Sequence, residues 1–249
     1  MVGAAPIVAG AGGVAVGRKC VATRRWLRHD GRMTLADILP VFQLRLATPS
    51  LELHLPGAED LASLGELAAR GVHDPARQPF GAEWTDQPVE AIPAAVVQYN
   101  WAVQSRIRPG TWELGFVVRH AGQIVGTQSI GAKDFAIRRE VHTGSWLGQA
   151  HQGQGFGTEM RAAVLELAFA GLAATLATTS AYTDNRPSNA VSRKLGYQPN
   201  GTQRDVIRGR VQVLQHLVLT PDRWAERRAV PVTIDGLDAC RDWLIGPTD

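Results

Sequence analysis

Alternating apolar and polar residues predict two short strands near the start of the folded part of the chain. Every second residue is apolar over 42–46, from Phe42, and again over 51–55, with Thr48-Pro49-Ser50 between the two runs. A period of two places alternate side chains on one buried face, as in a half-exposed strand. Over 58–70, leucines recur at helical spacing up to Gly71, which predicts a helix with a glycine after its last turn.

The rest of the chain predicts a mixed succession of elements. Helices are expected over 89–104, 158–170, 187–195 and 237–244, and strands over 112–119, 123–130, 141–147, 176–182, 197–207 and 211–219. Glycine-containing turns at 120–122 and 208–210 join two of the strand pairs as hairpins. The order shows neither the strict alternation of a doubly wound fold nor the segregation of a sandwich, so we expect a mixed α/β (α+β) fold.

Charge and cysteine content narrow the class of protein. Residues 1–32 hold six basic residues against Asp30 alone, so the net charge of +3 leaves a mildly acidic body over 33–249. This distribution argues against a nucleic-acid-binding surface on the folded part. No apolar run approaches the ~18–20 residues that span a bilayer, so no membrane association is expected. Cys20 and Cys240 form no disulfide framework, which indicates a reducing, cytoplasmic location.

Three parts are expected along the chain. Residues 1–33 are predicted to be a flexible basic leader or the result of a start codon placed too early, with Met33 as the true initiator. An organellar transit peptide is a further alternative for an arginine-containing, acid-poor leader. Residues 40–224 form the predicted domain, and 225–249 are a C-terminal extension. Either dimerisation or the covering of a sheet edge would explain Trp224 and Trp243 near that end.

A glycine-rich run, Gln152-Gly153-Gln154-Gly155-Phe156-Gly157, lies where a predicted strand is followed by a helix. Closely spaced glycines let backbone N–H groups converge on one point, and the helix N-terminus adds partial positive charge. Such a turn suits a phosphate or pyrophosphate. The glycine spacing lacks the last glycine of the dinucleotide fingerprint, and no Gly-Lys-Ser/Thr follows, as a Walker-type loop requires. A purely structural strand–helix connection is the alternative.

With its surroundings, this region resembles the GNAT superfamily of N-acyltransferases, whose pyrophosphate loop is Q/R-x-x-G-x-G/A. Gln152-x-x-Gly155-x-Gly157 matches that pattern in full. The resemblance covers roughly residues 42–224. Similarity to the RimJ/RimL-type branch is carried by 48–53, 144–148, 153–159, 184–189 and 194–197. The stretches 144–148 and 157–165 are also similar to a mycobacterial member of the superfamily that transfers succinyl groups.

This resemblance implies a GNAT fold, with a mixed, mostly antiparallel and splayed central sheet flanked by helices. An acyl-CoA would enter between the strands that end near Leu147 and begin near Leu176, and backbone groups of Trp146 and Leu147 would hold its pantetheine arm. Asn185 would contact the pantetheine, and Asn189 lies on the same helix face. The loop would hold the pyrophosphate through Gln152, Gly153, Gln154, Gly155, Phe156, Gly157 and Thr158.

The short helix over 187–195 carries the candidate residue for donating a hydrogen bond to the leaving group. Asn185, Ser188, Asn189 and Ser192 fall on one face of this helix and its start, because they are three or four residues apart. The resemblance implies that Ser188 lies near the sulfur as donor to the departing thiolate. A structural helix cap is the alternative for its hydroxyl. Many members of the superfamily have a tyrosine at the position of Ser192, and its absence here favours Ser188 as the donor.

His142 and Glu113 are the candidates for the general base. A histidine titrates near neutrality and could remove a proton through water, although His142 could equally be a surface residue of its strand. Trp84, Trp101 and Trp112 could line an acceptor pocket or pack in the core. The seven histidines show no metal-ligand spacing, so no metal is expected.

These observations predict an N-acyltransferase that moves an acyl group from acyl-CoA to a primary amine by direct attack. Acetyl-CoA is the default donor, and succinyl-CoA is the second option. The acceptor would be a protein N-terminus, a lysine or a small molecule, and a homodimer or higher homo-oligomer is compatible with the sequence. The alternative function is a GNAT-like module that senses acyl-CoA without catalysis.

Overall fold

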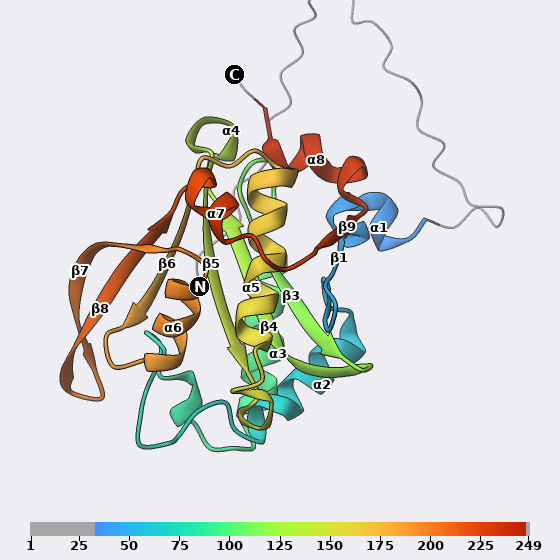
Figure 1. Ribbon diagram of the computed structural model, residues 1–249. Coiled ribbons are helices and arrows are strands. Elements are labelled where there is room, and N and C mark those ends of the chain that lie inside the picture. The colour runs from blue at the N-terminus through green and yellow to red at the C-terminus, as the bar shows by residue number, and fades with distance from the viewer. Residues whose placement is uncertain (1–32, 248–249) are drawn as a thin grey trace, which may run out of the picture.

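The computed structural model describes residues 33–247, which form one open sheet of nine strands with helices around it (Figure 1). The strand order is β7-β8-β6-β5-β4-β3-β2-β1-β9, and only β5 and β6 run parallel to each other. The expected mixed, mostly antiparallel sheet flanked by helices is therefore confirmed. The predicted leader lies outside the described residues except for Met33.

The elements follow the predicted order closely. The strands are β1 (Arg45–Ala47), β2 (Glu52–His54), β3 (Trp112–His120), β4 (Gln123–Ala132), β5 (Glu140–Leu147), β6 (Leu176–Tyr182), β7 (Gln198–Ile207), β8 (Arg210–Leu219) and β9 (Thr233–Asp235). The α-helices are α1 (Leu35–Ile38), α2 (Ala58–Ala69), α3 (Ile92–Gln104), α4 (Phe135–Arg138), α5 (Phe156–Glu166), α6 (Arg186–Lys194), α7 (Pro221–Arg227) and α8 (Leu237–Ile245). Short 3-10 helices are η1 (Pro40–Gln43), η2 (Trp84–Asp86) and η3 (Gln149–His151), and the π-helix η4 covers Leu167–Gly171.

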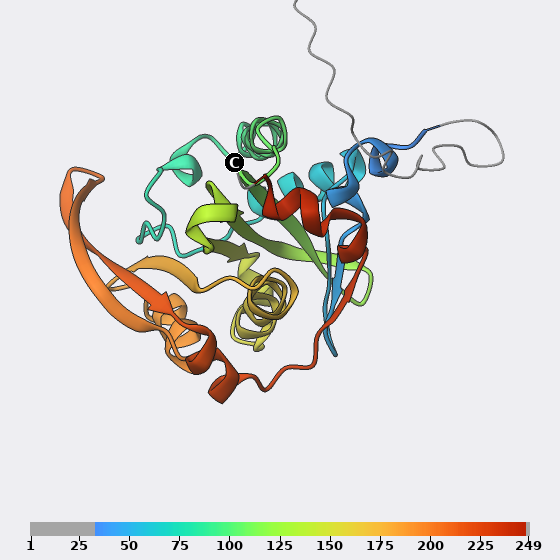
Figure 2. The same cartoon turned by 90° about the horizontal axis from the view of Figure 1, so that it is seen from above.

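Two layers of helices enclose the sheet. Figure 2 shows α5 and α3 on opposite sides of it. The α5 side holds the larger group of buried side chains, and residues 162–165 of that helix are fully inaccessible to solvent. On the other side, α2 and α3 bury a smaller group against Val117 and Ile124 of the sheet. The apolar side chains of α5 stabilise this position because burial of apolar surface is the main favourable term in folding.

Two predicted boundaries differ from the structure. Phe42 was expected in a strand, but it lies in η1, and β1 begins only at Arg45. Val41 and Leu44, three residues apart, are both fully buried. A 3-10 turn places residues at this spacing on the same side, so this segment buries its apolar side chains without forming a strand. The helix expected over 158–170 starts earlier, at Phe156, and its last turn is wider, since the Leu172 N–H donates to a carbonyl five residues back.

The C-terminal segment completes the sheet. β9 pairs antiparallel with β1 and covers that edge of the sheet. Leu237 and Leu244 of α8 join the main buried group, and the backbone carbonyl of Leu244 accepts a 2.8 Å hydrogen bond from the indole of Trp112. Trp224 is buried and packs on Phe169, with ring centroids 6.5 Å apart. Of the two explanations offered for this end of the chain, the structure shows the covering of an edge.

Asp60 joins the start of α2 to β2 and β3. Burial raises its pKa, but the Gly57 N–H at 3.0 Å, the Arg119 guanidinium and His54 outweigh that effect, and the pKa of Asp60 lies below its ordinary value of 3.8. Because the folded-state pKa is lowered, the carboxylate stabilises the fold above the unfolded value. This contribution is lost as the pH falls through the folded value.

We therefore expect Asp60→Asn to lower the urea midpoint at neutral pH and to flatten the loss of stability below about pH 5. Urea unfolding over an acid pH series would measure both effects. Asp238→Asn is the matched control, because the Asp238 carboxylate is exposed and forms its ion pair with Arg241 of its own helix. An unchanged acid dependence in Asp60→Asn would contradict the assignment.

Candidate functional site

An opening in the middle of the sheet is produced where β5 and β6 diverge. The two strands pair over only three positions, the last of which is His142↔Thr178. Beyond it, β5 stays paired with β4 as far as Leu147, while β6 stays paired with β8 as far as Tyr182. Within residues 33–247, each strand therefore presents a backbone edge without a strand partner to the opening.

The backbone of Ser145 faces this opening. The carbonyls of Val141 and Thr143 point towards β6, because they accept hydrogen bonds of 3.2 and 3.0 Å from the hydroxyls of two β6 threonines. Backbone direction alternates along a strand, so Ser145 and Leu147 share that direction, whereas Trp146 turns its carbonyl towards Gly126 of β4. Of the two residues expected as backbone contacts, Leu147 therefore faces the opening and Trp146 faces β4.

The glycine-rich loop follows the open end of β5. Gly153 and Gly155 have φ values of +75° and +90°, which favour glycine, and a Cβ on either would meet no protein atom within 4 Å. Gly155 caps α5, and its carbonyl accepts from the N–H of Thr158 at 3.0 Å. Among the described residues, the N–H groups of 153–157 have no acceptor. They are free to bind an anion in front of the helix, whereas that of Thr158 is already engaged.

Side-chain hydrogen bonds hold the two ends of this loop. The Gln152 amide donates to the carbonyl of Leu147 at 3.0 Å and to that of Val72 at 2.7 Å, so it ties the loop to both β5 and the segment after α2. Gln154 donates to the carbonyl of Ala150 at 3.0 Å. Both amides bind backbone carbonyls of the protein. The motif glutamine therefore positions the loop, and the free backbone N–H groups are left for a ligand.

The first turn of α5 is anchored on the opposite side by Glu159 and Phe156. The Glu159 carboxylate accepts hydrogen bonds from the Thr48 hydroxyl and from the Ser50 N–H at 2.8 Å. Phe156 is buried, with its ring centroid 4.6 Å from that of His120. The turn between β1 and β2 thus supports the start of α5. This contact explains why the motif stretches 48–53 and 153–159 are found in the same sequence although they are far apart along it.

The start of α6 leaves the Ser188 hydroxyl available. Asn185 is the N-cap, and its side-chain oxygen accepts from the Ser188 N–H at 3.2 Å. Asn189 is buried and donates to the carbonyls of Tyr182 at 2.9 Å and Asn185 at 3.0 Å. Within the described part of the chain, the half-buried Ser188 Oγ has no hydrogen-bond partner. Asn185 therefore makes the cap, and Ser188 is left free for another role.

A buried arginine lies beside this helix, although it was not among the residues expected at the site. Arg161 of α5 is 4% exposed, and its guanidinium donates to Ser192 Oγ at 3.0 Å and to Ser145 Oγ at 3.2 Å. The Ser192 hydroxyl donates in turn to the carbonyl of Ser188 at 3.1 Å. The sequence signal for it was a charged residue between Met160 and the apolar run 162–165.

The two candidate bases share one row across three strands. Gly131 of β4 lies opposite both Glu113 of β3 and His142 of β5, and a side chain on Gly131 would clash with the His142 ring. This row is on the face of the sheet that α3 covers, away from α5. On α3, partial burial raises the pKa of Tyr99, and the charge of Glu113 raises it further. The structure thus brings both candidates together at the inner end of the opening.

Of the tryptophans proposed for an acceptor pocket, only one lies close to the opening. Trp84 packs between Phe80 and Trp146 of β5, with ring centroids 5.2 and 6.0 Å apart. Trp112 is buried in the core, and Trp101 is 57% exposed on α3. Through Trp84, the segment between α2 and α3 is packed against the strand that borders the opening.

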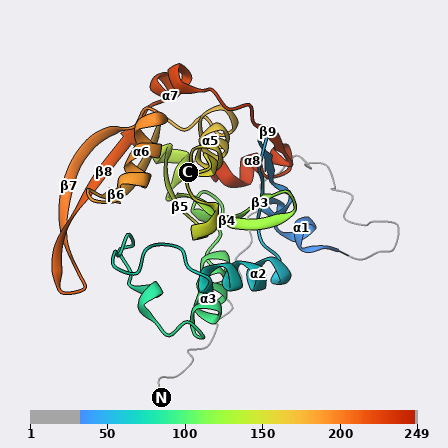
Figure 3. The same cartoon turned by 60° about the horizontal axis from the view of Figure 1, so that its bottom comes forward.

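The tip of the β7–β8 hairpin holds the same segment, 72–91. Arg208 donates to the Asp86 carboxylate and to the carbonyl of Pro75 at 2.8 Å, and its N–H donates to Glu83 at 2.6 Å. Figure 3 shows this segment at the same end of the molecule as α6 and the hairpin tip. A hollow of ≈ 470 Å³ between them is lined by Arg77, Thr183, Asp184 and Arg186. Arg186 is the first residue of α6, so the hollow adjoins the start of that helix.

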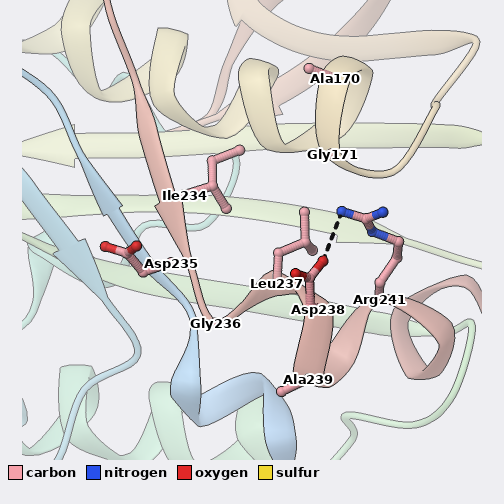
Figure 4. A pocket seen from close by; sticks show the side chains of 9 residues that line it. All are labelled: Ala170, Gly171, Ile234, Asp235, Gly236, Leu237, Asp238, Ala239 and Arg241. Atoms are coloured by element: carbon pink, nitrogen blue, oxygen red, sulfur yellow. Dashed lines mark ion pairs between the residues drawn. The ribbon is translucent and has the colours of Figure 1, made fainter.

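A second hollow, of ≈ 490 Å³, lies between the end of η4 and the C-terminal segment, where Asp238 and Arg241 form an ion pair of 3.2 Å (Figure 4). None of the residues that line it belongs to β5, β6, the glycine-rich loop or α6. Within residues 33–247, no cluster of three His, Cys, Asp or Glu side chains is arranged to hold a metal ion. No described helix has the length and apolar character needed to cross a membrane.

Several solved structures share this fold. The ribosomal L7/L12 α-N-protein acetyltransferase RimL, in complex with coenzyme A, is 19% identical, with a TM-score of 0.58 over 71% of this chain and 97% of that one. RimJ of Mycobacterium smegmatis, in complex with CoA-disulfide, is 20% identical, with a TM-score of 0.59 over 79% and 91%. The microcin C7 self-immunity acetyltransferase MccE, in complex with acetyl-CoA and AMP, is 16% identical, with a TM-score of 0.54 over 69% and 93%.

The sequence also identifies the family directly. Residues 50–198 match the acetyltransferase (GNAT) domain, and this range holds β2 to β6, the glycine-rich loop and α6. The match therefore includes both walls of the opening and the glycine-rich turn at its end. The chain belongs to the GNAT acetyltransferase family.

Proposed function

We propose that this protein transfers an acyl group from an acyl-CoA to a primary amine, with the CoA lying in the opening between β5 and β6. One observation carries the proposal. Five consecutive backbone N–H groups, those of 153–157 at the start of α5, have no acceptor among the described residues, and they lie directly beyond the open end of β5. Converging N–H groups at a helix N-terminus bind a pyrophosphate well.

The pantetheine arm would extend from this loop along β5 as an additional strand. The backbone of Ser145, and next to it that of Leu147, offers the hydrogen-bonding edge that such an extended chain requires. Asn185 lies across the opening at the start of α6 and would contact the arm from that side. RimL and MccE, which share the fold, hold coenzyme A and acetyl-CoA in their structures.

The chemistry requires a neutral amine, an aligned thioester and a tolerated leaving group. His142 or Glu113 would accept the proton of the incoming amine, directly or through water. The amine nitrogen then attacks the carbonyl carbon, the carbon–sulfur bond breaks, and its electron pair leaves with the sulfur. Ser188 would donate a hydrogen bond to that sulfur, because its hydroxyl has no other partner in the described part of the chain.

Acetyl-CoA is the default donor, because the family is one of acetyltransferases. A succinyl donor stays an alternative, carried by the likeness of 144–148 and 157–165 to a succinyl-transferring member of the superfamily. The acceptor is proposed to be a primary amine on a protein N-terminus, a lysine or a small molecule. An acyl-CoA sensor without catalysis is the second candidate, and the free Ser188 hydroxyl favours the enzyme over it.

Thermal-shift and native mass-spectrometric titrations with acetyl-CoA, succinyl-CoA and free CoA test the proposal. We expect each to bind and raise the unfolding temperature, since a ligand that binds only the folded state stabilises it. Release of free thiol across a panel of amines then tests turnover. If none of the three binds, both the enzyme and the sensor are excluded, whereas binding without thiol release for any amine would favour the sensor.

A further inference from the structure

Arg161 is a buried cation without an anionic partner. It is 4% exposed, and its two terminal nitrogens donate to the neutral hydroxyls of Ser145 and Ser192. Its Nε has no hydrogen-bond partner, and no carboxylate pairs with it within residues 33–247. Burial lowers the pKa of Arg161, but the ordinary value for arginine is so high that the group stays charged. Buried charges are normally paired, so this one requires an explanation.

The charge lies at the opening between β5 and β6. Ser145 belongs to the strand whose backbone borders the opening, and Ser192 belongs to α6 on the other side. Tyr197 is the titratable group that acts on Arg161, and burial raises the pKa of this phenol, so it stays neutral at physiological pH. Within the described part of the chain, nothing on α5, α6 or β5 neutralises the guanidinium. An anionic ligand in the opening would supply the partner that these described residues lack.

The chemistry of the leaving group supplies such an anion. A thiol has a pKa of about 8.5, whereas an aliphatic hydroxyl, like water, has a far higher pKa and is a far weaker acid. Ser188 can therefore donate a hydrogen bond to the departing sulfur but cannot give up its proton to it. The sulfur has to leave as a thiolate, and a positive charge placed where that negative charge develops stabilises it.

We propose that Arg161 stabilises the coenzyme A thiolate as the carbon–sulfur bond breaks, acting through its charge and through the hydroxyls of Ser145 and Ser192. The proposal rests on the acyl transfer proposed above. The amine nitrogen gains the acyl group and loses a proton to the base. The sulfur leaves with the bonding electron pair and takes up a proton from solvent after release. Arg161 neither gives nor takes a proton, and it positions charge for the reaction.

Such a role predicts a conflict between stability and function. Replacing an unpaired buried cation with an apolar side chain of similar volume is often neutral or stabilising. We expect Arg161→Met to unfold at the same or a higher temperature than the wild type, because the surroundings of this side chain are largely apolar. The hydroxyls of Ser145 and Ser192 can form hydrogen bonds with nearby backbone groups or with water instead. Arg161→Lys keeps the charge and serves as the second variant.

The decisive measurement is the pKa of the thiol of bound coenzyme A, followed by the ultraviolet absorbance of the thiolate. In the wild-type complex we expect it to lie about 1 to 3 below that of free coenzyme A, as for a group beside an opposite charge. Arg161→Met should remove most of this lowering, and Arg161→Lys should retain it. Arg193→Met is the control, because Arg193 is an exposed arginine of α6, the residue next to Ser192, and it should retain the lowering in full.

An equal thiol pKa in the wild type and Arg161→Met complexes would overturn this role of Arg161 while leaving the proposed function intact. Failure of coenzyme A to bind any of the four proteins would instead overturn the proposed function and this inference with it. If Arg161→Met does not fold, the thiol pKa in the Arg161→Lys complex is compared with that in the wild-type complex. Loss of the lowered thiol pKa in this variant, which keeps the charge, would also contradict the proposal. A loss of activity confined to succinyl-CoA, with the thiol pKa unchanged, would assign Arg161 to the acyl group and overturn the thiolate role.

Discussion

Gly155→Val is expected to weaken coenzyme A binding by about 100-fold or more. At φ of +90° a branched side chain is strained, and relief of that strain rotates the backbone of the loop. Hydrogen bonds to a charged group are worth about 1.5–3 kcal/mol each, so losing two loop N–H groups from the pyrophosphate is enough for this effect. Isothermal titration calorimetry with coenzyme A, performed well below the unfolding temperature of the variant, would measure it.

Variants of two other glycines serve as controls, because they distinguish a loss of coenzyme A binding from the loss of stability that backbone strain causes. Gly201 has a φ of +95° and equally open surroundings, but it lies on the edge strand β7. Gly201→Val should lose similar stability, about 1–2 kcal/mol, with unchanged affinity. Gly157→Ala should change neither, because its new Cβ would make an ordinary 3.5 Å contact with Val191. Equal affinity losses in Gly155→Val and Gly201→Val would contradict a pyrophosphate site at the loop.

Local features of the fold could be predicted from the sequence because their causes are local. The turns at 120–122 and 208–210 were expected as hairpins, and in the structure Gly122 and Gly209 have the positive φ values that such tight turns require. The helix ending at Gly71 and the glycine loop at 152–157 were found in the same way. In each case a few adjacent residues determine the backbone conformation.

Features that depend on distant partners could not be predicted in this way. β9 pairs with β1 across most of the chain, and no short-range pattern identifies one three-residue strand as the partner of another. The opening between β5 and β6 was expected only from family resemblance. It depends on which neighbours, β4 and β8, hold the two strands apart. Phe42 was assigned to the wrong element because a period of two and a 3-10 turn fit the same few residues.

The candidate site shows the same division. The loop glycines and the α6 signature were visible as motifs, and Gly131 brings His142 and Glu113 together although they are far apart in the sequence. Arg161 was not recognised as a candidate site residue. Its role is inferred from the absence of a carboxylate around it among the described residues, which only the folded structure can show. A buried charge is a property of its surroundings and not of its position in the sequence.

Ser188→Ala is expected to lower the turnover number by about 10- to 100-fold and to leave the affinity for coenzyme A within a factor of about two. The fold does not use this hydroxyl, so the variant should unfold at the wild-type temperature. The loss corresponds to one hydrogen bond to a charged group, about 1.5–3 kcal/mol, made only when charge develops on the sulfur. Stopped-time assays of thiol release with the best amine from the acceptor panel would give the turnover number.

Asn185→Ala and Ser188→Thr distinguish this role from helix capping. Asn185 makes the cap, so its removal should cost about 1 kcal/mol of stability in urea unfolding, a cost that Ser188→Ala should not share. Ser188→Thr retains a hydroxyl and should recover a large part of the turnover. If Ser188→Ala instead destabilises the protein as Asn185→Ala does, with turnover of the folded fraction unchanged, the hydroxyl belongs to the structure of α6. The thiolate would then depend on Arg161 and the two serines beside it.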